Sequence, residues 1–578
     1  MKNFAALLIF NFSFLIFNGF AQGNLPIGFS PEELQQMQLT KYDPPVYTNQ
    51  WGIKTPPTSP IRAMAEWEES QAVTITWTDY TTMLKDIVKA AQTECVVYII
   101  CTDSNAVRTF LTTNSVPLTN IRCKIAPFNS VWARDYGANS CYLNDVDTHV
   151  FVDWKYNRPT RPKDDTIPSV IARDWNIPIY LNTQTPNDIT GTGGNWMSDG
   201  LGTAFGSNLT LTENSGKTTA QIDQIFNQYM GITKYIHMTV LPYDGIHHID
   251  MHMKLLDEET LLVGQYPTGI ADGPQIEANI QYILSTYTTS FGTPYKIVRV
   301  VQPPDQTNKY PNSGGDYLTY ANATFLNKKV IVPQYYQKYD TTALRQWKEA
   351  LPGYTIVPIN SNASIVASGA LHCITHEIGV NDPLLISSRA LPNTNNCSSP
   401  YTVNARIQHK SGIANAKIWW TSDTLQPYQS VSKTNTSGYN WQGAIPALAS
   451  TGQIFYYIEA NSVSGKTLNR PIPAPKAYWK FKVSCLTTVE ETAPASIEPI
   501  YPNPSKGITC IPVSSITDAE GKIYLTDVLG NEVRVIYAGK IPAGSKNFFI
   551  NTSDIAAGTY AVVIRTVNGT TAQRLIVR

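Results

Sequence analysis

Runs of β-branched and aromatic residues alternate with polar loops between about residue 62 and residue 388. Such runs are typical of β-strands. Six of them predict strands, at Val73–Trp77, Val96–Ile100, His149–Trp154, Thr260–Gly264, Tyr295–Val301 and Lys329–Pro333. Between the first two, apolar residues recur at helical spacing and predict one buried helix face, formed by Met83, Leu84, Ile87, Val88 and Ala91. This alternation of strands and helices predicts an α/β fold.

The pattern changes after Cys397, where short strands follow one another with turn residues between them and little helical periodicity. Four such strands, at 403–408, 417–420, 454–459 and 478–483, predict a β-sandwich of the immunoglobulin type. A polar stretch at residues 487–495 predicts a linker, and a last all-β module follows it. The predicted order is a signal peptide at residues 1–21, an α/β region at 22–396, the sandwich at 397–485, the linker at 486–496 and the last module at 497–578.

The N-terminal residues have the features of a secretory signal. Lys2 supplies a positive start, an apolar run covers Ala5–Phe20, and small residues at 19–21 offer a cleavage site. A membrane anchor is the alternative, but asparagines interrupt the run and it is shorter than the roughly 20 apolar residues that a spanning helix needs. We therefore expect export, and no stable membrane span in the mature protein.

Composition narrows the classes of function. The chain has 578 residues, with 44 Lys and Arg against 44 Asp and Glu, so its net charge is zero. A nucleic-acid binder that works through an overall basic field is excluded, because such a field needs an excess of Lys and Arg. Eight cysteines in an exported chain suggest disulfides. The pair Cys397 and Cys485 brackets the predicted sandwich and is the best candidate; the weaker candidates pair Cys95 with Cys101 and Cys123 with Cys141.

Two short motifs in the α/β region place polar residues beside glycines. Asp135 lies between bulky residues in Trp132–Gly137, and a glycine pair opens Thr192–Asp199. Taken alone, each motif is typical of a turn, in which glycine also permits close approach of the backbone to another group.

Two further motifs carry histidines. If His247–His252 is a strand, His248, Asp250 and His252 share one face, which suits a buried histidine, a metal site or a base beside a carboxylate. The second motif, His372–Glu377, has Cys373 and His376 three residues apart, and together the two segments favour zinc. Cys373 equally suits a nucleophile, because small residues precede it and nearby histidines favour the thiolate. A structural cysteine or half of a disulfide stays open.

Seven motifs occur in a fixed order along the α/β region, at Arg62–Glu68, Trp132–Asp135, Tyr156–Pro159, Thr192–Asp199, His248–Asp250, Tyr320–Asn322 with Val330–Pro333, and Ala370–Glu377. In residue type and order they resemble the Porphyromonas-type peptidylarginine deiminases, in the agmatine deiminase branch of the pentein superfamily. The resemblance implies a five-bladed α/β propeller with the active site on its axis. It also implies that the enzyme uses no cofactor and no transition metal, against the zinc interpretation.

The resemblance assigns roles to residues by their position in these motifs. It implies that Cys373 is the nucleophile and that His248 is the general acid and base. Asp135 and Asp250 are expected to hold the substrate's guanidinium, with Asn322 as a further polar group of the site. This set suits the chemistry, because a guanidinium is a planar cation that two carboxylates can hold by paired N–H bonds. The substrate cation and an adjacent imidazolium are both expected to favour the thiolate.

The resemblance further implies a tunnel lined by Trp132 and two arginines that bind the α-carboxylate of a C-terminal arginine. Arg158 matches directly, whereas Arg161 matches only after a shift of one residue, because Thr160 is inserted between them. Bidentate pairing of arginine with a carboxylate does not tolerate misplacement. The resemblance therefore supports a preference for C-terminal arginine less directly than it supports the deimination reaction. At Gly245 the family has an aromatic residue, and we expect the entrance to be wider.

The last module has a resemblance of its own, carried by Tyr501–Pro504, Leu529–Val533, Gly558–Tyr560 and Gln573–Arg578. These motifs resemble the C-terminal sorting domain of proteins exported by the type IX secretion system. That resemblance implies the secretion machinery as a partner, and release or attachment at the cell surface. A fibronectin-like adhesive module is the alternative.

The expected function is therefore that of an exported deiminase that converts arginine, foremost at the C-terminus of peptides, to citrulline and ammonia through a covalent bond to Cys373. The expected substrate is an arginine-containing peptide or a small guanidine. Deimination of agmatine or free arginine, a surface adhesin without activity, and a zinc hydrolase are the alternatives. An ammonia assay would distinguish the adhesin, and sensitivity to chelators would distinguish the hydrolase.

Overall fold

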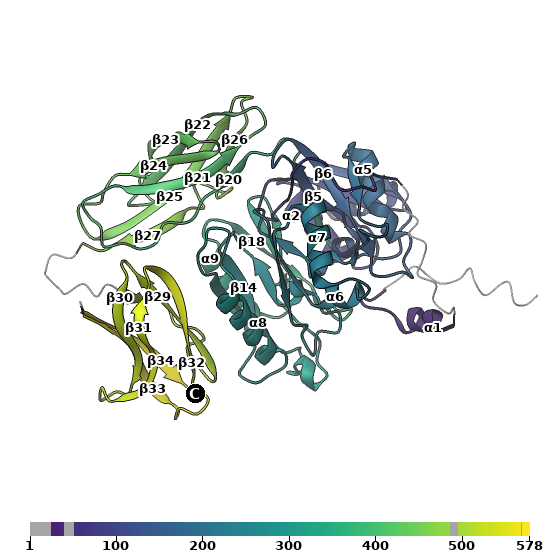
Figure 1. The fold of residues 1–578 in the computed structure, drawn as a ribbon. Coiled ribbons are helices and arrows are strands. Elements are labelled where there is room, and N and C mark those ends of the chain that lie inside the picture. Colours follow the sequence, from purple (N-terminus) through teal and green to yellow (C-terminus); the bar gives the residue numbers. More distant parts are fainter. Residues whose placement is uncertain (1–24, 40–50, 486–494, 568) are drawn as a thin grey trace, which may run out of the picture.

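The computed structural model describes residues 25–39, 51–485, 495–567 and 569–578. An α/β region is followed along the chain by two all-β regions (Figure 1). The predicted signal peptide and most of the predicted linker lie outside the described residues. Among the residues described, no helix is long and apolar enough to cross a membrane.

The α/β region contains five sheets of three or four strands. The first consists of β1 (Ile61–Ala63), β5 (Asn139–Leu143), β6 (Thr148–Asp153) and β8 (Ile179–Leu181). The second consists of β10 (Met197–Ser198), β11 (Thr203–Ser207) and β12 (Lys234–Met238). The third consists of β13 (Met253–Leu255), β14 (Thr260–Gln265) and β15 (Lys296–Val301). The fourth consists of β16 (Thr324–Leu326), β17 (Lys329–Gln334) and β18 (Thr355–Asn360).

The fifth sheet joins the two ends of the α/β region. It consists of β19 (His376–Gly379), β2 (Ser70–Thr76), β3 (Val96–Cys101) and β4 (Ile121–Ile125). β19 pairs antiparallel with β2, with His376 opposite Thr74, so a strand from the end of the region closes against a strand from its start. A small ladder of β7 (Lys155–Tyr156) and β9 (Thr190–Gly191) lies outside the five sheets.

All five sheets share one strand pattern. A first strand pairs antiparallel with a second, and the second pairs parallel with a third. Parallel neighbours need a crossover, which a helix usually supplies. The crossover helices are α2 (Thr81–Ala91), α3 (Ser104–Thr113), α5 (Ile167–Trp175), α6 (Leu209–Glu213), α7 (Thr219–Met230), α8 (Gly273–Thr286) and α9 (Gln337–Ala350). All six predicted strands and the predicted helix face of α2 are confirmed.

The first all-β region contains one eight-stranded sheet. Its strands are β20 (Leu385–Ser387), β21 (Tyr401–Gln408), β22 (Ile413–Thr421), β23 (Gln429–Ser437), β24 (Asn440–Ile445), β25 (Gly452–Ser462), β26 (Thr467–Arg470) and β27 (Trp479–Val483). Seven of them follow one another in the order β20-β21-β24-β23-β22-β25-β26, and the eighth, β27, also pairs with β25. Alternate residues of β21 are buried and exposed, as expected for a strand with one face toward a core. Arg470 of β26 reaches back to the α/β region and pairs with buried Glu258 at 3.0 Å.

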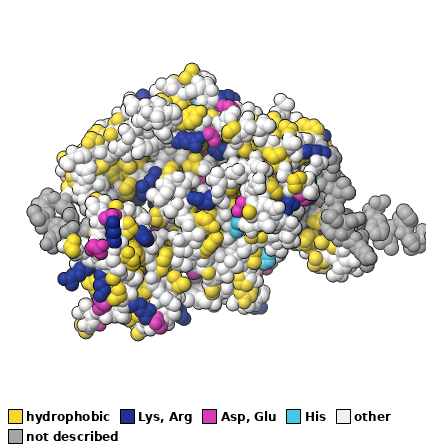
Figure 2. Space-filling model, in the orientation of Figure 1, with side chains coloured by type: hydrophobic (Ala, Val, Ile, Leu, Met, Phe, Trp, Pro, Cys, Tyr) yellow, Lys and Arg dark blue, Asp and Glu magenta, His cyan; other side chains and the backbone are white. Residues whose placement is uncertain are grey.

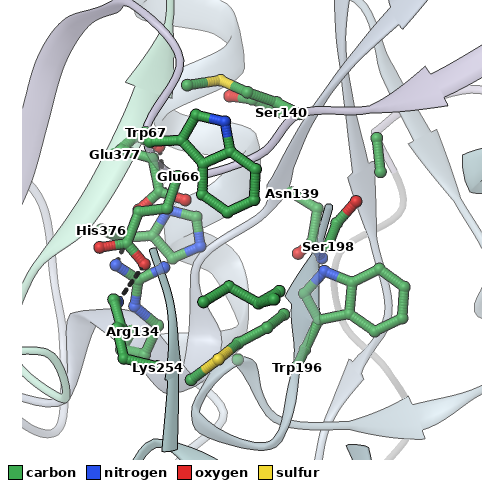
Figure 3. A pocket seen from close by; sticks show the side chains of 15 residues that line it. Glu66, Trp67, Arg134, Asn139, Ser140, Trp196, Ser198, Lys254, His376 and Glu377 are labelled. Atoms are coloured by element: carbon green, nitrogen blue, oxygen red, sulfur yellow. Dashed lines mark hydrogen bonds and ion pairs between the residues drawn. The ribbon is translucent and has the colours of Figure 1, made fainter. Parts of the chain in front are cut away.

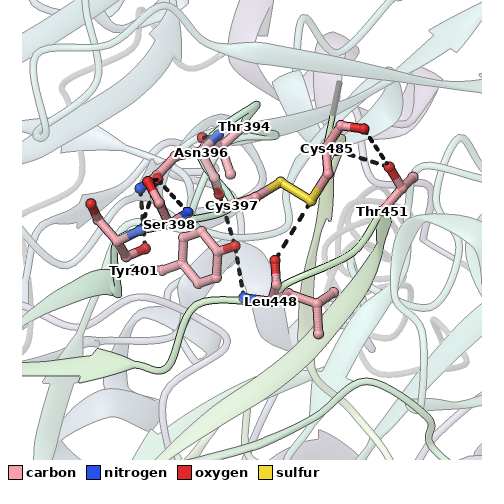
Figure 4. Close-up of a disulfide and its surroundings, with 9 residues drawn as sticks. Thr394, Asn396, Cys397, Ser398, Tyr401, Leu448, Thr451 and Cys485 are labelled. Carbon is pink, nitrogen blue, oxygen red and sulfur yellow. Dashed lines mark hydrogen bonds between the residues drawn. A yellow bond between two sulfur atoms is a disulfide. The ribbon is translucent and has the colours of Figure 1, made fainter. Parts of the chain in front are cut away.

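The disulfide predicted between Cys397 and Cys485 is confirmed, with Cα atoms 5.6 Å apart (Figure 4). The weaker pairings are wrong, since all four of their cysteines are free thiols. Cys95 and Cys101 lie at opposite ends of the extended strand β3, roughly 20 Å apart at about 3.3 Å per residue. Cys123 on β4 and Cys141 on β5 belong to different sheets.

The last region packs two small sheets around its own core. One sheet consists of β28 (Ala495–Ile497), β29 (Ile508–Ser515) and β32 (Gly544–Asn551). The other consists of β30 (Ala519–Thr526), β31 (Glu532–Ile541), β33 (Gly558–Thr566) and β34 (Gly569–Val577). Buried side chains such as Ile511, Leu525 and Val562 fill the space between them. On the face shown in Figure 2, acidic and basic side chains lie interspersed, in keeping with a net charge of zero.

Candidate active site

The candidate site residues stand at equivalent places in the five sheets. Asp135, Gly194, Asp250, Asn322 and Cys373 each lie two to four residues before the first strand of a sheet, namely β5, β10, β13, β16 and β19. Short helical turns, α4 (Ala133–Tyr136), η2 (Gly193–Asn195) and η3 (Ile249–Met251), carry the first three. A fold with one repeated strand pattern thus presents residues from distant parts of the chain at the same kind of position.

Cys373 lies fully buried between an amide and a carboxylate. Asn322 donates a hydrogen bond from Nδ2 to the Cys373 sulfur at 3.2 Å, and its Oδ1 accepts from the backbone N–H of His372 at 3.0 Å. The Cys373 thiol lies 3.6 Å from Oδ2 of Asp250. Asn322 therefore holds both the sulfur and the loop that carries it.

His248 and Asp135 form the second part of the cluster. Nδ1 of His248 and Oδ1 of Asp135 are 3.7 Å apart, and both side chains are buried. Gly194 makes this approach possible, because a Cβ there would lie 2.3 Å from Nδ1 of His248 and 3.0 Å from Oδ1 of Asp135. At such distances any other residue would displace the histidine or the carboxylate. The glycine pair is thus explained by close approach rather than by a turn alone.

Five polar atoms of this cluster are buried without a hydrogen-bond partner among the described residues. They are both carboxylate oxygens of Asp135, both ring nitrogens of His248, and Oδ1 of Asp250. Native proteins leave few such atoms, since each costs about 1–3 kcal/mol or more when the group is charged. A concentration of them beside a buried thiol indicates a site shaped for a polar, cationic ligand.

Burial has a strong effect on the pKa values of Cys373 and His248. Burial raises the pKa of the Cys373 thiol well above its ordinary value, and the charges of Asp250 and Asp135 raise it further. Burial likewise lowers the pKa of His248 to about 3, against the opposing effect of Asp250. These shifts favour a neutral thiol and a neutral imidazole at pH 7. The pairing of an imidazolium with a thiolate around a bound cation stays a prediction.

The two carboxylates differ in their environment. Burial and the charge of Asp250 raise the pKa of Asp135 to about 7. Burial acts most strongly and would raise the pKa of Asp250, but the hydrogen bond with His372 and the nearby positive charge of Lys254 together hold the pKa below the ordinary value. At neutral pH Asp250 is ionised, and Asp135 is divided between its two forms.

A network of paired charges lies behind Asp250. His372 contacts Oδ2 of Asp250 through Nδ1 at 2.7 Å and Oε2 of Glu66 through Nε2 at 3.0 Å. Both nitrogens donate when the ring is cationic, since carboxylates only accept. Glu66 also pairs with the buried Lys254 of β13. His372 thus fixes the orientation of Asp250 through Oδ2, the same oxygen that lies 3.6 Å from the Cys373 sulfur.

A second ion pair supports the Cys373 loop. Arg134 pairs with Glu377 at 2.7 Å, and its backbone N–H donates to the carbonyl of Cys373 at 3.1 Å. Figure 3 shows Glu66, Arg134 and Glu377 on one side of a cavity of about 30 Å³, with Trp196 on the other. Such a cavity has room for two or three water molecules at about 10–15 Å³ each.

Sequence reasoning missed the supporting charges. Glu66 lay in a quoted motif without a role, and neither Arg134 nor Lys254 was singled out. The signal available was a lysine inside the otherwise apolar segment 253–256, where a charge implies a buried partner.

The expected geometry of the histidine motif is wrong. His248 precedes the 3₁₀ turn η3 instead of lying in a strand, so strand alternation does not place His248, Asp250 and His252 on one face. Among the described residues, no three His, Cys, Asp or Glu side chains are arranged to hold a metal ion. Cys373 is a free thiol, which also excludes the disulfide interpretation.

The remaining predicted residues border the cluster and contact the N-terminal segment. Trp132 is fully buried, and its Nε1 donates to the carbonyl of Leu25 at 2.9 Å. Arg158 donates from Nε to the carbonyl of Ile27 at 2.9 Å, and Arg161 pairs with Glu33 at 2.8 Å. The two arginines thus lie beside the site, but both are engaged by residues 25–33.

Comparison with known proteins places this geometry in a family. The model of the Porphyromonas-type peptidyl-arginine deiminases matches residues 62–378, more than half of the chain. The chain belongs to this family. The predicted recognition is thereby confirmed, and the protein is a deiminase, a hydrolase that acts on the C–N bonds of guanidino groups.

Individual relatives of this deiminase are distant in sequence. A Legionella pneumophila protein provisionally named an agmatine deiminase is 24% identical over 277 residues, covering 45% of this chain and 75% of its own. A crystal structure provisionally named an agmatine deiminase is 18% identical and covers 57% of this chain and all of its own, with a TM-score of 0.50. A structure from Porphyromonas gingivalis, provisionally named an arginine deiminase, is 20% identical and covers 55% of this chain and 98% of its own, with a TM-score of 0.48. The α/β deiminase fold is thus confirmed, followed by all-β regions.

The C-terminal end of the deiminase matches a second model. The secretion system C-terminal sorting domain covers residues 499–578. This confirms the predicted sorting module, and it indicates secretion or attachment at the cell surface.

Proposed function

We propose that this deiminase hydrolyses the guanidinium of arginine, foremost at the C-terminus of peptides, to citrulline and ammonia through a covalent intermediate on Cys373. The observation that supports this best is the set of five unpartnered polar atoms on Asp135, His248 and Asp250 around a buried thiol. In this proposal the five sheets are the blades of a propeller with the site on its axis. Residues 397–485 then form an immunoglobulin-like sandwich.

The carboxylates hold the substrate cation. The free oxygens of Asp135 and Asp250 accept N–H bonds from the guanidinium, which fixes its plane and compensates two buried negative charges. His372 positions Asp250 for this task through their 2.7 Å contact. A buried cation between these groups also favours ionisation of the thiol.

The first step forms the covalent intermediate. On substrate binding the Cys373 proton moves to His248, and the sulfur bonds to the guanidinium carbon. The bond from that carbon to one terminal nitrogen then breaks, and the imidazolium returns its proton to the leaving nitrogen, which departs as ammonia. An amidino-thioether on Cys373 remains, with Asn322 beside its sulfur.

The second step releases the product. His248 removes a proton from water, and the resulting hydroxide adds to the same carbon. The carbon–sulfur bond breaks, the sulfur regains a proton, and the ureido group leaves. In sum, one guanidinium and one water give one urea-type product and one ammonium ion.

Substrate preference depends on the arginines at the edge of the site. A peptide ending in arginine offers a carboxylate to Arg158 and Arg161, whereas agmatine has none. The alternative, deimination of agmatine or free arginine, is favoured by the names of the relatives rather than by a contact in this chain.

The test uses mass spectrometry to measure conversion of the guanidinium to the ureido product with three substrates at equal concentration. They are a peptide ending in arginine, the same peptide with an amidated C-terminus, and agmatine. We expect kcat/KM to be at least about tenfold higher for the free carboxylate, the loss typical of a charge-assisted hydrogen bond of about 1.5–3 kcal/mol. Equal rates on all three would contradict carboxylate recognition, and no ammonia from any guanidine would contradict the site assignment.

A further inference from the structure

The N-terminal segment of residues 25–33 lies directly against the predicted substrate site. Ile27 is completely buried, and its N–H donates to the carbonyl of Ala367 at 3.0 Å. On the other side Trp132 donates to the carbonyl of Leu25. Residues 25–27 are thus tied both to the strand-end loop before Cys373 and to the aromatic residue that precedes Asp135.

The segment also occupies both arginines. Its backbone carbonyls accept from Arg158 at Ile27, at 2.9 Å, and from Arg161 at Pro26 and Gly28, at 2.8 and 2.6 Å. The ring of Phe29 lies 4.9 Å from the guanidinium carbon of Arg158.

Glu33 makes the contact that a substrate carboxylate would make. Its two oxygens accept from Nε of Arg161 at 2.9 Å and from its terminal nitrogen at 2.8 Å, a bidentate pair. Thr160 donates to the same carboxylate at 2.7 Å. The residue inserted between the two arginines therefore serves to hold Glu33. Burial acts against the charge of Glu33, but these bonds hold its pKa below the ordinary value.

The helix that follows, α1 (Pro31–Leu39), contributes few further contacts with the α/β region. In α1, Glu33 is buried, whereas its neighbours Glu32 and Leu34 are exposed. Figure 1 shows α1 at the edge of the α/β region. Ser30 and Glu33 cap the helix start, with Ser30 N–H donating to Oε2 of Glu33 at 2.8 Å. The helix is thus attached through Glu33 rather than through an apolar face.

We propose that residues 25–39 are a built-in inhibitory segment in which Glu33 takes the place of the α-carboxylate of a C-terminal arginine. The inference rests on the proposed function, because it assigns Arg161 to the substrate carboxylate. A peptide ending in arginine and the segment then compete for the same guanidinium, and the peptide binds only when the segment leaves. Displacement or removal of the segment increases activity.

The first experiment compares Glu33→Gln with Glu32→Gln in the full chain. The second variant is the matched control, since Glu32 is the adjacent residue, of the same type, and solvent-exposed. We expect Glu33→Gln to lower KM for a peptide ending in arginine about tenfold while kcat stays unchanged, and Glu32→Gln to leave both unchanged. Unaltered KM in Glu33→Gln, with turnover intact, overturns the inhibitory segment and leaves the proposed function standing.

The second experiment needs no turnover and so separates the two proposals. Hydrogen exchange of residues 25–39 is measured in the Cys373→Ala chain with a peptide ending in arginine, and with its C-terminal amide. We expect exchange to become at least several-fold faster with the free carboxylate and to stay unchanged with the amide. Equal exchange with both peptides overturns the proposal, whatever the activity of the enzyme.

A synthetic peptide of residues 25–39 gives a third measurement. Added to the Glu33→Gln chain, it should inhibit competitively against a peptide ending in arginine. The same synthetic peptide with glutamine at position 33 should inhibit at least tenfold more weakly. Equal inhibition by both would show that the carboxylate is not recognised, and would overturn the inference.

Discussion

Asp250 separates two groups of buried charged and polar side chains that differ in one respect. On one side, the carboxylate oxygens of Asp135, the ring nitrogens of His248 and one oxygen of Asp250 have no hydrogen-bond partner among the described residues. On the other side, Glu66, Lys254, Arg134, Glu377 and His372 are joined by ion pairs and hydrogen bonds. Both groups are buried. They differ in whether other residues of the chain supply their hydrogen-bond and ion-pair partners.

We expect this difference to separate the residues that bind a ligand from those that hold them in place. A buried ion pair is complete without substrate and resists rearrangement, because breaking it leaves an uncompensated charge. The unpartnered group stores an unfavourable free energy that only a cation of the right shape relieves. His372 belongs to both, since it connects the paired network to Asp250.

The largest expected effect is loss of the nucleophile. Cys373→Ala should lower kcat by about three orders of magnitude or more while substrate binding stays measurable, because the covalent step is removed and the carboxylates remain. Ammonia release and calorimetric binding measure the two quantities. Cys141→Ala is the control, since Cys141 is also a buried free thiol but lies in β5. Ammonia release at the original rate in Cys373→Ala would contradict the assignment.

Breaking the paired network should mainly cost stability. Glu377→Gln leaves Arg134 buried without its ion pair, and we expect the free energy of unfolding to fall by about 3–5 kcal/mol. Denaturant unfolding measures this. Glu349→Gln is the control, because Glu349 pairs with Arg345 on an exposed helix surface, where a pair contributes about 0.3–0.5 kcal/mol. Similar losses in both variants would contradict the comparison.

Neutralising the unpartnered carboxylate of Asp135 should increase the free energy of unfolding, whereas Glu377→Gln decreases it. Because the pKa of folded Asp135 is about 7 against an ordinary 3.8, its contribution to stability is complete at low pH and is lost as pH rises through 7. Asp135→Asn should therefore be more stable than the parent chain at pH 8 and equal to it near pH 3, while activity falls about a hundredfold. Thermal unfolding at the two pH values measures it; a variant less stable at pH 8 would refute the idea.

The same pKa predicts the pH dependence of the parent enzyme. Ionised Asp135 accepts the guanidinium, so kcat/KM should rise with pH through about 7, by up to about tenfold per unit below that value. A profile that is flat between pH 6 and 8 would argue against a role for Asp135 in binding.

The smallest effect is expected at the residue shared by the two groups. His372→Gln removes the ring that joins Asp250 to Glu66 but can keep one hydrogen bond, and we expect kcat/KM to fall about tenfold with little change in folding. As a positioning residue, His372 should also move the pH profile, because Asp250 loses the bond that lowers its pKa. A fall in stability without a shifted profile would assign it a purely structural role.

Much of this protein could be predicted from its sequence, because the candidate site residues occur in short motifs. Local pattern predicted six strands of the α/β region (β2, β3, β6, β14, β15 and β17) and the disulfide of Cys397 and Cys485. The deiminase family and the sorting module were predicted from the resemblance of short motifs. The strand proposed for His247–His252 was wrong, because alternation over six residues cannot distinguish a strand from the turn η3. The domain boundaries stay predictions, although β20 shows that the all-β sheet takes up a strand before Cys397.

The amino-acid sequence by itself determined which residue types are available for guanidinium chemistry and the order in which they occur. Only the tertiary structure decided which of them have partners, because burial and pairing depend on side chains from remote segments. Glu33 and Arg161 are 128 positions apart in the sequence, and the local sequence around each residue does not predict its contact with the other. The protonation states of Cys373 and His248 were likewise decided by desolvation, a property of the packed interior rather than of the residues themselves.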